Sequence, residues 1–152
     1  MSAGRLRDQI HSLSAASSDE AERILVIKLG ALGDFVQAMG PAAAIRAHHE
    51  GAEITLLTTA PFVELARAAP YFDHIWVDER PGLFDPAALW RLRKRLREAH
   101  FTRVYDLQTA RRTSWYFQLM GPGKRPPWSG IAAERYRRPE FLKIEYDGKS
   151  RP

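Results

Sequence analysis

The feature that most constrains the fold of this chain is an alternation of short apolar runs with longer segments of helical spacing. The runs cover residues 23–28 (RILVIK), 53–58 (EITLLT), 74–77 (HIWV) and 102–107 (TRVYDL). The first run is nearly continuous in Ile, Leu and Val, which is typical of a strand buried on both faces of a parallel sheet. Strands that alternate with helices form βαβ units. The sequence therefore predicts an α/β protein with a Rossmann-like, doubly wound parallel sheet.

The segments between these runs carry the start signals and the spacing of helices. We expect the first helix to run from Asp34, a favoured N-cap residue, to about His49, with Pro41 causing a kink or a later start. Small and apolar residues recur at helical spacing within it, namely Val36, Gly40, Ala43, Ala44 and Ala47. Three further helices are expected at residues 61–69, 85–99 and 112–120.

Length and composition suit one globular domain. The chain has 152 residues, of which 45% are hydrophobic and 27% charged. The absence of cysteine excludes a disulfide scaffold and thiolate chemistry, and it fits the cytoplasm. We expect residues 1–22 to be a polar leader, residues 23–131 the Rossmann-like domain, and residues 132–152 a basic tail or a truncated end.

The net charge of +5 is compatible with nucleic acid, anionic lipid or a phosphorylated substrate as partner. No recognition motif for nucleic acid accompanies the basic residues, so we expect no nucleic-acid partner. Much of the charge lies between Arg91 and Arg97. This run predicts either a solvated helix face or a contact with an anionic membrane leaflet, which Trp90 would help to anchor.

The loop from Lys28 to Asp34 lies where parallel sheets bind their ligands, beyond the carboxyl end of a strand. Gly30 and Gly33 permit a tight turn and a close approach by a ligand, and the following helix start favours anions. A dinucleotide fingerprint needs a third glycine, and a Walker loop needs Lys and Ser or Thr after its last glycine, so neither motif matches. The residues alone leave open whether Asp34 caps a helix or acts on a ligand.

Three motifs, spread over residues 23–131, carry a resemblance to a known family. The segment 28–34 (KLGALGD) resembles the opening motif of the family 9 glycosyltransferases, the heptosyltransferases, which often have Ser where this chain has Gly30. Residues 105–108 (YDLQ), followed by Arg112, resemble the family's D-x-Q with a basic residue four positions later. Residues 128–130 (WSG) resemble the segment at which members of the family begin another strand.

The resemblance implies a two-lobed GT-B fold, of which this chain is the amino-terminal, acceptor-side lobe without the donor-binding domain. It implies an inverting, metal-independent transfer of a heptose-like sugar from ADP-heptose to a lipopolysaccharide-core acceptor. No cofactor is expected, and the sequence contains no D-x-D pair for a metal. Asp34 would be the general base that takes the proton of the acceptor hydroxyl. The protein would be cytoplasmic, with a peripheral contact at the inner membrane.

The other candidate residues are expected to bind substrate. Lys28 is predicted to contact an acceptor phosphate or carboxylate or to orient Asp34; otherwise it is a strand-end lysine that extends to solvent. Arg112 could bind such an anion in a bidentate manner, or be an exposed helix-start residue that Arg111 could replace. The remaining candidates for the substrate site are Gly30, Gly33, Gln37 and Gln108.

Two other interpretations stay open. The first is a non-enzymatic Rossmann-like module that binds a nucleotide or a phosphate with its glycine loop. The second is a truncated product that folds poorly. A metal site is not expected, because the histidines, including the pair His48 and His49, lack ligand spacing.

Overall fold

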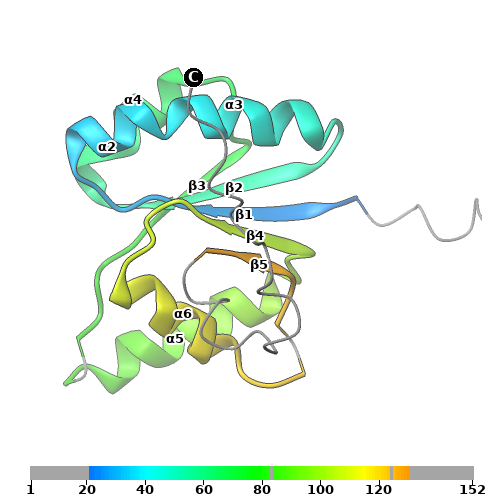
Figure 1. The fold of residues 1–152 in the computed structure, drawn as a ribbon. Coiled ribbons are helices and arrows are strands. Elements are labelled where there is room, and N and C mark those ends of the chain that lie inside the picture. The colour runs from blue at the N-terminus through cyan, green and yellow to red at the C-terminus, as the bar shows by residue number, and fades with distance from the viewer. Residues whose placement is uncertain (1–20, 83, 124, 131–152) are drawn as a thin grey trace, which may run out of the picture.

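The fold is taken from a computed structural model, which describes residues 21–82, 84–123 and 125–130. Five parallel strands form one sheet in the order β3-β2-β1-β4-β5 (Figure 1). The predicted α/β class with a parallel sheet is confirmed. The predicted leader and basic tail lie almost wholly outside the described residues. The strands are β1 (Arg23–Ile27), β2 (Glu53–Thr58), β3 (His74–Val77), β4 (Arg103–Asp106) and β5 (Trp128–Ser129).

Helices cover both faces of the sheet (Figure 1). One face carries α2 (Leu32–Gln37), α3 (Met39–His48) and α4 (Val63–Ala68), which follows the short 3₁₀ helix η1 (Ala60–Phe62). The other face carries α5 (Pro86–Glu98) and α6 (Arg111–Met120). None of the helices in the described ranges is both long and apolar enough to cross a membrane.

The strand order creates a switch point beside the central strand β1. The chain passes outward from β1 to β2 and β3, and then returns to the opposite side of β1 as β4. At the carboxyl ends, Ile27 of β1 lies opposite Asp106 of β4. Because the connections after these two strands depart to opposite faces of the sheet, they leave between them the place where open α/β sheets bind ligands.

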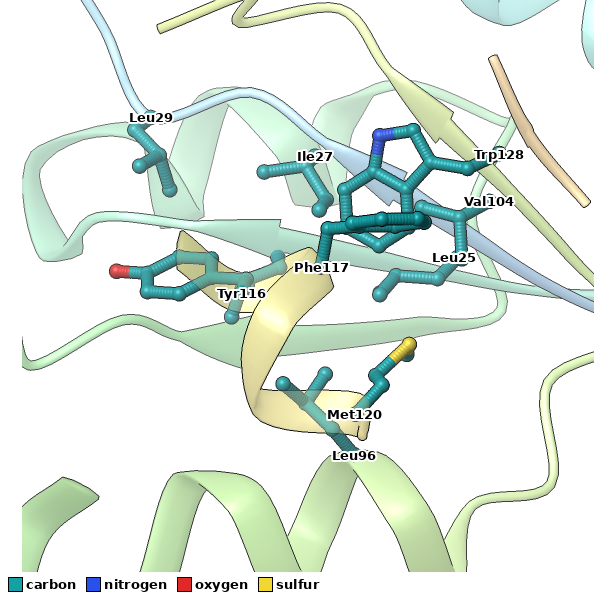
Figure 2. Packing of buried hydrophobic residues seen from close by; sticks show 10 residues of the cluster. Leu25, Ile27, Leu29, Leu96, Val104, Tyr116, Phe117, Met120 and Trp128 are labelled. Atoms are coloured by element: carbon teal, nitrogen blue, oxygen red, sulfur yellow. The ribbon is translucent and has the colours of Figure 1, made fainter. Parts of the chain in front are cut away.

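Strand β1 is buried on both faces, as its continuous apolar run predicts. Its alternate residues Leu25 and Ile27 face α5 and α6, in a cluster that includes Tyr116, Phe117 and Trp128 (Figure 2). The rings of Phe117 and Trp128 meet edge to face at a centroid distance of 5.2 Å. The residues of β1 between them belong to the core on the other face, in a cluster of Ile24, Val26, Phe35, Ile45, Ala52, Ile54, Leu56 and Ala66.

The first helix differs from the prediction at its start. It begins at Leu32 with Ala31 as N-cap, so Asp34 is a first-turn residue and not the cap. It also divides at Ala38 into α2 and α3. Pro41 is the third residue of α3, where a missing amide proton costs little because first-turn amides have no partner within the helix. Of the kink or later start that Pro41 predicts, the structure shows an interruption of the helix at Ala38 and no start later than Asp34.

The buried face of this helical segment also differs from the predicted spacing. Val36, a member of the predicted apolar series, is 54% exposed. The ring of Phe35 is fully buried instead and stacks on Phe62 at 5.0 Å. A phenyl ring removes far more apolar area from water than alanine methyl groups do, so Phe35 sets the helix rotation. The buried residues are Phe35, Ala38, Ala42, Ile45 and His49.

The remaining boundaries agree with the prediction to within a residue or two. Strands β2 and β3 are as predicted, whereas the expected 61–69 helix is divided into η1 and α4. Asp85 caps α5, because its Oδ1 accepts a hydrogen bond from the amide of Ala88 at 2.9 Å. Helix α6 begins at Arg111, one residue earlier than expected. The strand expected at Trp128 is present as β5.

Candidate active site

Gln108 joins the loops that follow β1 and β4. Its Oε1 accepts hydrogen bonds from the amides of Leu29 at 2.9 Å and Gly30 at 3.2 Å. Because both partners are donors, the atom between them must be the oxygen of the Gln108 amide. From the side of β2, the hydroxyl of Thr59 donates to the carbonyl of Leu29 at 2.8 Å. The bend after β1 is therefore fixed from two neighbouring strands.

The two glycines of this loop have different roles. Gly30 has a φ of +147°, and a Cβ atom there would lie 3.1 Å from the ring of Phe62. This position therefore requires glycine. Gly33 lies within α2, where a Cβ atom would meet nothing within 4 Å. The prediction that a tight turn needs both glycines is right for Gly30 and wrong for Gly33.

Lys28 lies directly after β1 and is buried, with 6% of its surface exposed. Its Nζ donates to the carbonyl of Leu107 at 3.3 Å, and no carboxylate of the described chain pairs with it. The alternative that this lysine extends to solvent is therefore wrong. A buried ammonium whose partner is neutral is costly, and it makes the place favourable for an anion.

Asp34 lies in the first turn of α2, exposed to solvent. Its side chain has no hydrogen bond or ion pair with any described residue, whereas its backbone carbonyl accepts from the amide of Ala38 at 3.0 Å. An accessible, unpaired carboxylate can accept a proton from a hydroxyl that comes within about 3 Å.

Asp106 ends β4 and is 3% exposed. Its Oδ1 accepts hydrogen bonds from the amides of Gln108 at 3.1 Å and Thr109 at 3.0 Å. Burial raises the pKa of the Asp106 carboxyl, although these amides, the Thr113 hydroxyl and the Trp128 indole oppose the shift. The indole N–H of Trp128 and Oδ2 of Asp106 have no hydrogen-bond partner among the described residues. The indole therefore affects the Asp106 carboxyl only because it lies close to it.

Arg112 does not contact the Gln108 loop. Its Nη1 donates to the carbonyl of Pro81 at 3.4 Å, in the connection after β3. Nearby, the hydroxyl of Tyr116 donates to Asp78 Oδ2 at 2.6 Å, and burial raises the pKa of that hydroxyl. Arg112 is exposed, as is Arg111, and Gln37 is exposed at the end of α2. No hydrogen bond or ion pair among the described residues joins the side chain of Arg112 or Gln37 to that of Asp34.

Thr59 and Asp78 are not among the predicted site residues, although both lie at the same end of the sheet as the candidate site. Each is a buried polar residue just beyond the end of a strand, β2 and β3 respectively. A polar residue directly after an apolar strand was therefore the available signal. Tyr116 could not be found in this way, because its hydroxyl reaches Asp78 from the middle of α6.

Two of the hollows that border α5 are lined by different residues of the helix. One, of about 230 Å³, is lined at the carboxyl end of β3 by Asp78, Glu79, Arg91 and Arg95, together with four less polar residues. The other, of about 420 Å³, involves the second half of α5 and His100, and therefore lies towards the start of β4, away from Asp34. Its lining residues are Trp90, Arg93, Lys94, Arg97, Glu98 and His100.

Comparisons of sequence give one partial relative. No protein-family model matches the chain. A curated protein of Haemophilus influenzae with the name "Putative glycosyltransferase" is 36% identical over 59 residues, which cover 39% of this chain and 17% of that protein. The likeness is therefore local.

Comparisons of structure extend over more of the chain. The glycosyl transferase family 9 structure from Veillonella parvula matches with a TM-score of 0.62 and 19% identity, covering 77% of this chain and 35% of the other. The E. coli heptosyltransferase WaaC with ADP matches with a TM-score of 0.50 and 15% identity, covering 62% and 32%. The same enzyme with ADP-2-deoxy-2-fluoro heptose matches with a TM-score of 0.53 and 14% identity, covering 72% of this chain and 35% of the other.

The chain spans about a third of the length of these solved structures. Identities below a fifth establish a shared fold rather than shared residues at the site. The five-stranded parallel sheet with helices on both faces is the part of the architecture in common. The resemblance that the three motifs indicate is thereby confirmed, and this chain has the fold of the glycosyltransferases of family 9 over about a third of their length.

Proposed function

We propose that this chain is the acceptor-side lobe of an inverting, metal-independent glycosyltransferase in which Asp34 is the general base. The observation that carries the proposal is an exposed carboxylate without a partner in the described chain, in the first turn of the helix that follows the central strand. Ligands of open parallel sheets bind at this edge. The fold shared with family 9 glycosyltransferases supports the same reaction class.

In this mechanism the acceptor hydroxyl gives its proton to Asp34 while its oxygen attacks the anomeric carbon of the donor sugar. The bond from that carbon to the nucleotide diphosphate breaks, and the diphosphate leaves with the electron pair. Attack from the face opposite the leaving group inverts the anomeric centre. General-base assistance of this kind contributes roughly 10² to 10⁴ in rate.

Lys28 and Gly33 are the groups that we assign to the acceptor side. The buried ammonium of Lys28 would attract an acceptor phosphate or carboxylate, because its carbonyl partner leaves the charge uncompensated. The missing side chain of Gly33 leaves open space beside Asp34 for a sugar ring. Arg112 and Gln37, both exposed, would reach the acceptor from the rim of the site.

We assign the donor to a second lobe that these residues do not include. WaaC has been solved with ADP and with a fluorinated ADP-heptose, so ADP-heptose is the donor that we propose. The acceptor would be a lipopolysaccharide core, and the reaction would take place on the cytoplasmic side of the inner membrane.

The central test is Asp34→Asn in a transfer-competent protein that joins this lobe to its donor-binding lobe. We expect kcat with ADP-heptose and truncated lipopolysaccharide to fall by about 10² to 10⁴, because asparagine cannot take a proton. The unfolding midpoint in urea should stay unchanged, since Asp34 has no side-chain partner within the described residues. Transfer at the unsubstituted rate would refute Asp34 as the base.

The alternative of a nucleotide-binding module is tested with the 152-residue chain itself. Titration with the acceptor oligosaccharide should shift the amide resonances of Lys28, Gly33 and Gln108, whereas ADP, ATP and NAD should leave them unchanged. Tight binding of a nucleotide at the Gly30 bend would favour the module. Robust heptose transfer by these residues alone would show that no separate donor lobe is needed.

A membrane contact fits the outer side of α5. Trp90 is 61% exposed there, Lys94 lies over its ring at 5.3 Å, and Arg93 and Arg97 line the adjoining hollow. Basic residues beside an exposed indole favour an anionic lipid surface. Sedimentation with vesicles containing phosphatidylglycerol should exceed that with phosphatidylcholine alone, and Trp90→Ala together with Arg93→Ala should abolish the difference. Equal sedimentation with both lipids would contradict this contact.

A further inference from the structure

We propose that Gln108 is a positioning residue, which fixes the bend before α2 and thereby the place of Asp34 at the sheet edge. The inference rests on the proposed function of Asp34. It differs from the role in substrate binding that the motif implies, because the side-chain oxygen of Gln108 is already taken by two backbone amides. What the residue contributes to the reaction is therefore the geometry of the loop.

The bend after β1 depends on Gln108. The amides of Leu29 and Gly30 both point at one side-chain oxygen, and neither makes another hydrogen bond in the described part of the chain. Leu29 and Gly30 are themselves buried, so water cannot easily replace that oxygen. Removing the acceptor would leave two buried donors without a partner.

The orientation of Gln108 is itself fixed by Asp106. Asp106 Oδ1 accepts from the amides of Gln108 and Thr109, and this turn places Thr109 at a φ of +49°. A β-branched residue rarely adopts this left-handed conformation, which costs free energy unless the surroundings impose it. The buried Asp106 carboxylate supplies that constraint. The strained turn points Gln108 towards β1.

The bend at Gly30 leads directly into the helix that carries Asp34. Helix α2 begins at Leu32, two residues after Gly30, and has no side-chain cap of its own. Its buried anchor is Phe35, which stacks on Phe62, and Phe62 also limits the space at Gly30. The direction in which α2 leaves the sheet is therefore set by the bend on one side and Phe35 on the other. Moving the bend would displace the Asp34 carboxylate.

The first experiment measures amide hydrogen exchange in the 152-residue chain. Gln108→Met keeps the side-chain length but removes the acceptor, and we expect the amides of Leu29 and Gly30 to exchange at least about tenfold faster, since opening no longer breaks a bond. Gln108→Glu keeps the acceptor and should keep the protection. Gln118→Met is the matched control, because Gln118 accepts from Arg125 on the exposed side of α6.

Unchanged exchange at both amides in Gln108→Met would overturn the proposal. If this variant does not fold, Gln108→Asn gives the same test, because its shorter side chain cannot reach both amides. Protection that persists in Gln108→Asn would likewise overturn it.

The second experiment uses the two-lobed, transfer-competent protein. A positioning role predicts that Gln108→Met lowers kcat at least about tenfold with little change in the KM for the acceptor, and that Gln108→Glu restores most of kcat. A rise in KM with kcat unchanged would assign Gln108 to substrate binding instead. If Asp34→Asn leaves transfer intact while Gln108→Met still accelerates exchange, the proposed base fails and the link between Gln108 and the bend survives.

Discussion

Charged residues are paired at the amino ends of the strands, whereas Lys28, Asp34 and Asp106 at the carboxyl ends have no ion-pair partner among the described residues. At the amino ends of the strands, Arg23 pairs with Glu53 at 3.2 Å, and Glu53 also contacts His74 at 2.5 Å. Arg46 of α3 pairs with Asp73 at 2.6 Å, and Asp73 accepts from the amide of Ile54 at 2.7 Å. These charges neutralise one another and join neighbouring elements, so they serve the fold.

At the carboxyl ends of β1 and β4, the charged side chains form no ion pair with any described residue. Lys28 and Asp106 are buried, and the hydrogen bonds that they make go to backbone groups. Asp34 is exposed and has no partner in the described ranges. A buried charge without a counter-ion costs stability, which natural proteins tolerate chiefly where a ligand or a reaction uses it. The contrast therefore supports the proposal that the site lies at the carboxyl ends of the strands.

The pKa values of the Asp73 and Asp106 carboxyl groups are shifted in opposite directions. Partial burial would raise the pKa of Asp73, but the amide of Ile54 and the guanidinium of Arg46 outweigh it, so the net shift is downward. Asp106 has amide and hydroxyl partners but no cation, and burial raises its pKa. As pH rises, ionisation of Asp73, which pairs with Arg46, therefore increases the stability of the fold, whereas ionisation of the desolvated Asp106 decreases it.

The largest expected effect comes from crowding Asp106. A Cβ atom at Gly130 would lie 2.6 Å from the Cβ of Asp106, so Gly130→Ala should lower the free energy of unfolding by about 3 kcal/mol. Gly123→Ala is the control, because Gly123 has a φ of +81° but open space around it, and backbone strain alone costs about 1 kcal/mol. Urea unfolding measures both. Equal losses would show that Asp106 is not rigidly placed.

A pair of substitutions to methionine tests the contrast between the edges directly. Arg46→Met removes hydrogen bonds to the carbonyls of Tyr71 and Ala52 and the pair with Asp73, and should cost about 2 kcal/mol. Lys28→Met removes a buried charge with one neutral partner, and should change stability by less than about 1 kcal/mol or increase it. Thermal and urea unfolding would compare the two. A greater loss in Lys28→Met would remove the distinction between the edges.

The pH dependence of stability tests Asp106. Because the pKa of Asp106 is raised in the folded state, the fold binds this proton more tightly than the unfolded chain does. Its contribution to stability is therefore present below the unfolded pKa of about 3.9 and is lost as pH rises through the folded pKa. Asp106→Asn should remove that decline and make the unfolding free energy less dependent on pH above 4. An unchanged pH profile would contradict a desolvated carboxyl group.

The smallest expected effect is that of Gly33→Ala. Since Gly33 is helical and a Cβ atom there meets nothing, alanine should raise the unfolding free energy by about 0.5 kcal/mol. If the open space beside Asp34 accommodates a sugar, acceptor binding should weaken in the same variant, as calorimetry would show. Gly40→Ala, at another helical glycine with open space around it, is the matched control for helix propensity.

The sequence by itself determined the class of the fold, and it predicted the tight turn after β1 where we propose the site. The continuous apolar run of β1 requires burial on both faces, and alternating strands and helices leave few topologies other than a parallel sheet. Gly30 was correctly assigned to a turn because no other residue suits its backbone. These features follow from local patterns, so one sequence suffices to find them.

Tertiary structure decided how the segments face one another. The rotation of α2 depends on the stacking of Phe35 on Phe62, two residues separated by the whole of β2, and the helical spacing pointed to Val36 instead. The contacts of Gln108 with Leu29 and of Arg112 with Pro81 likewise join residues far apart in the chain. Such contacts arise only when β4 pairs beside β1, since that pairing brings two distant loops to the same edge of the sheet.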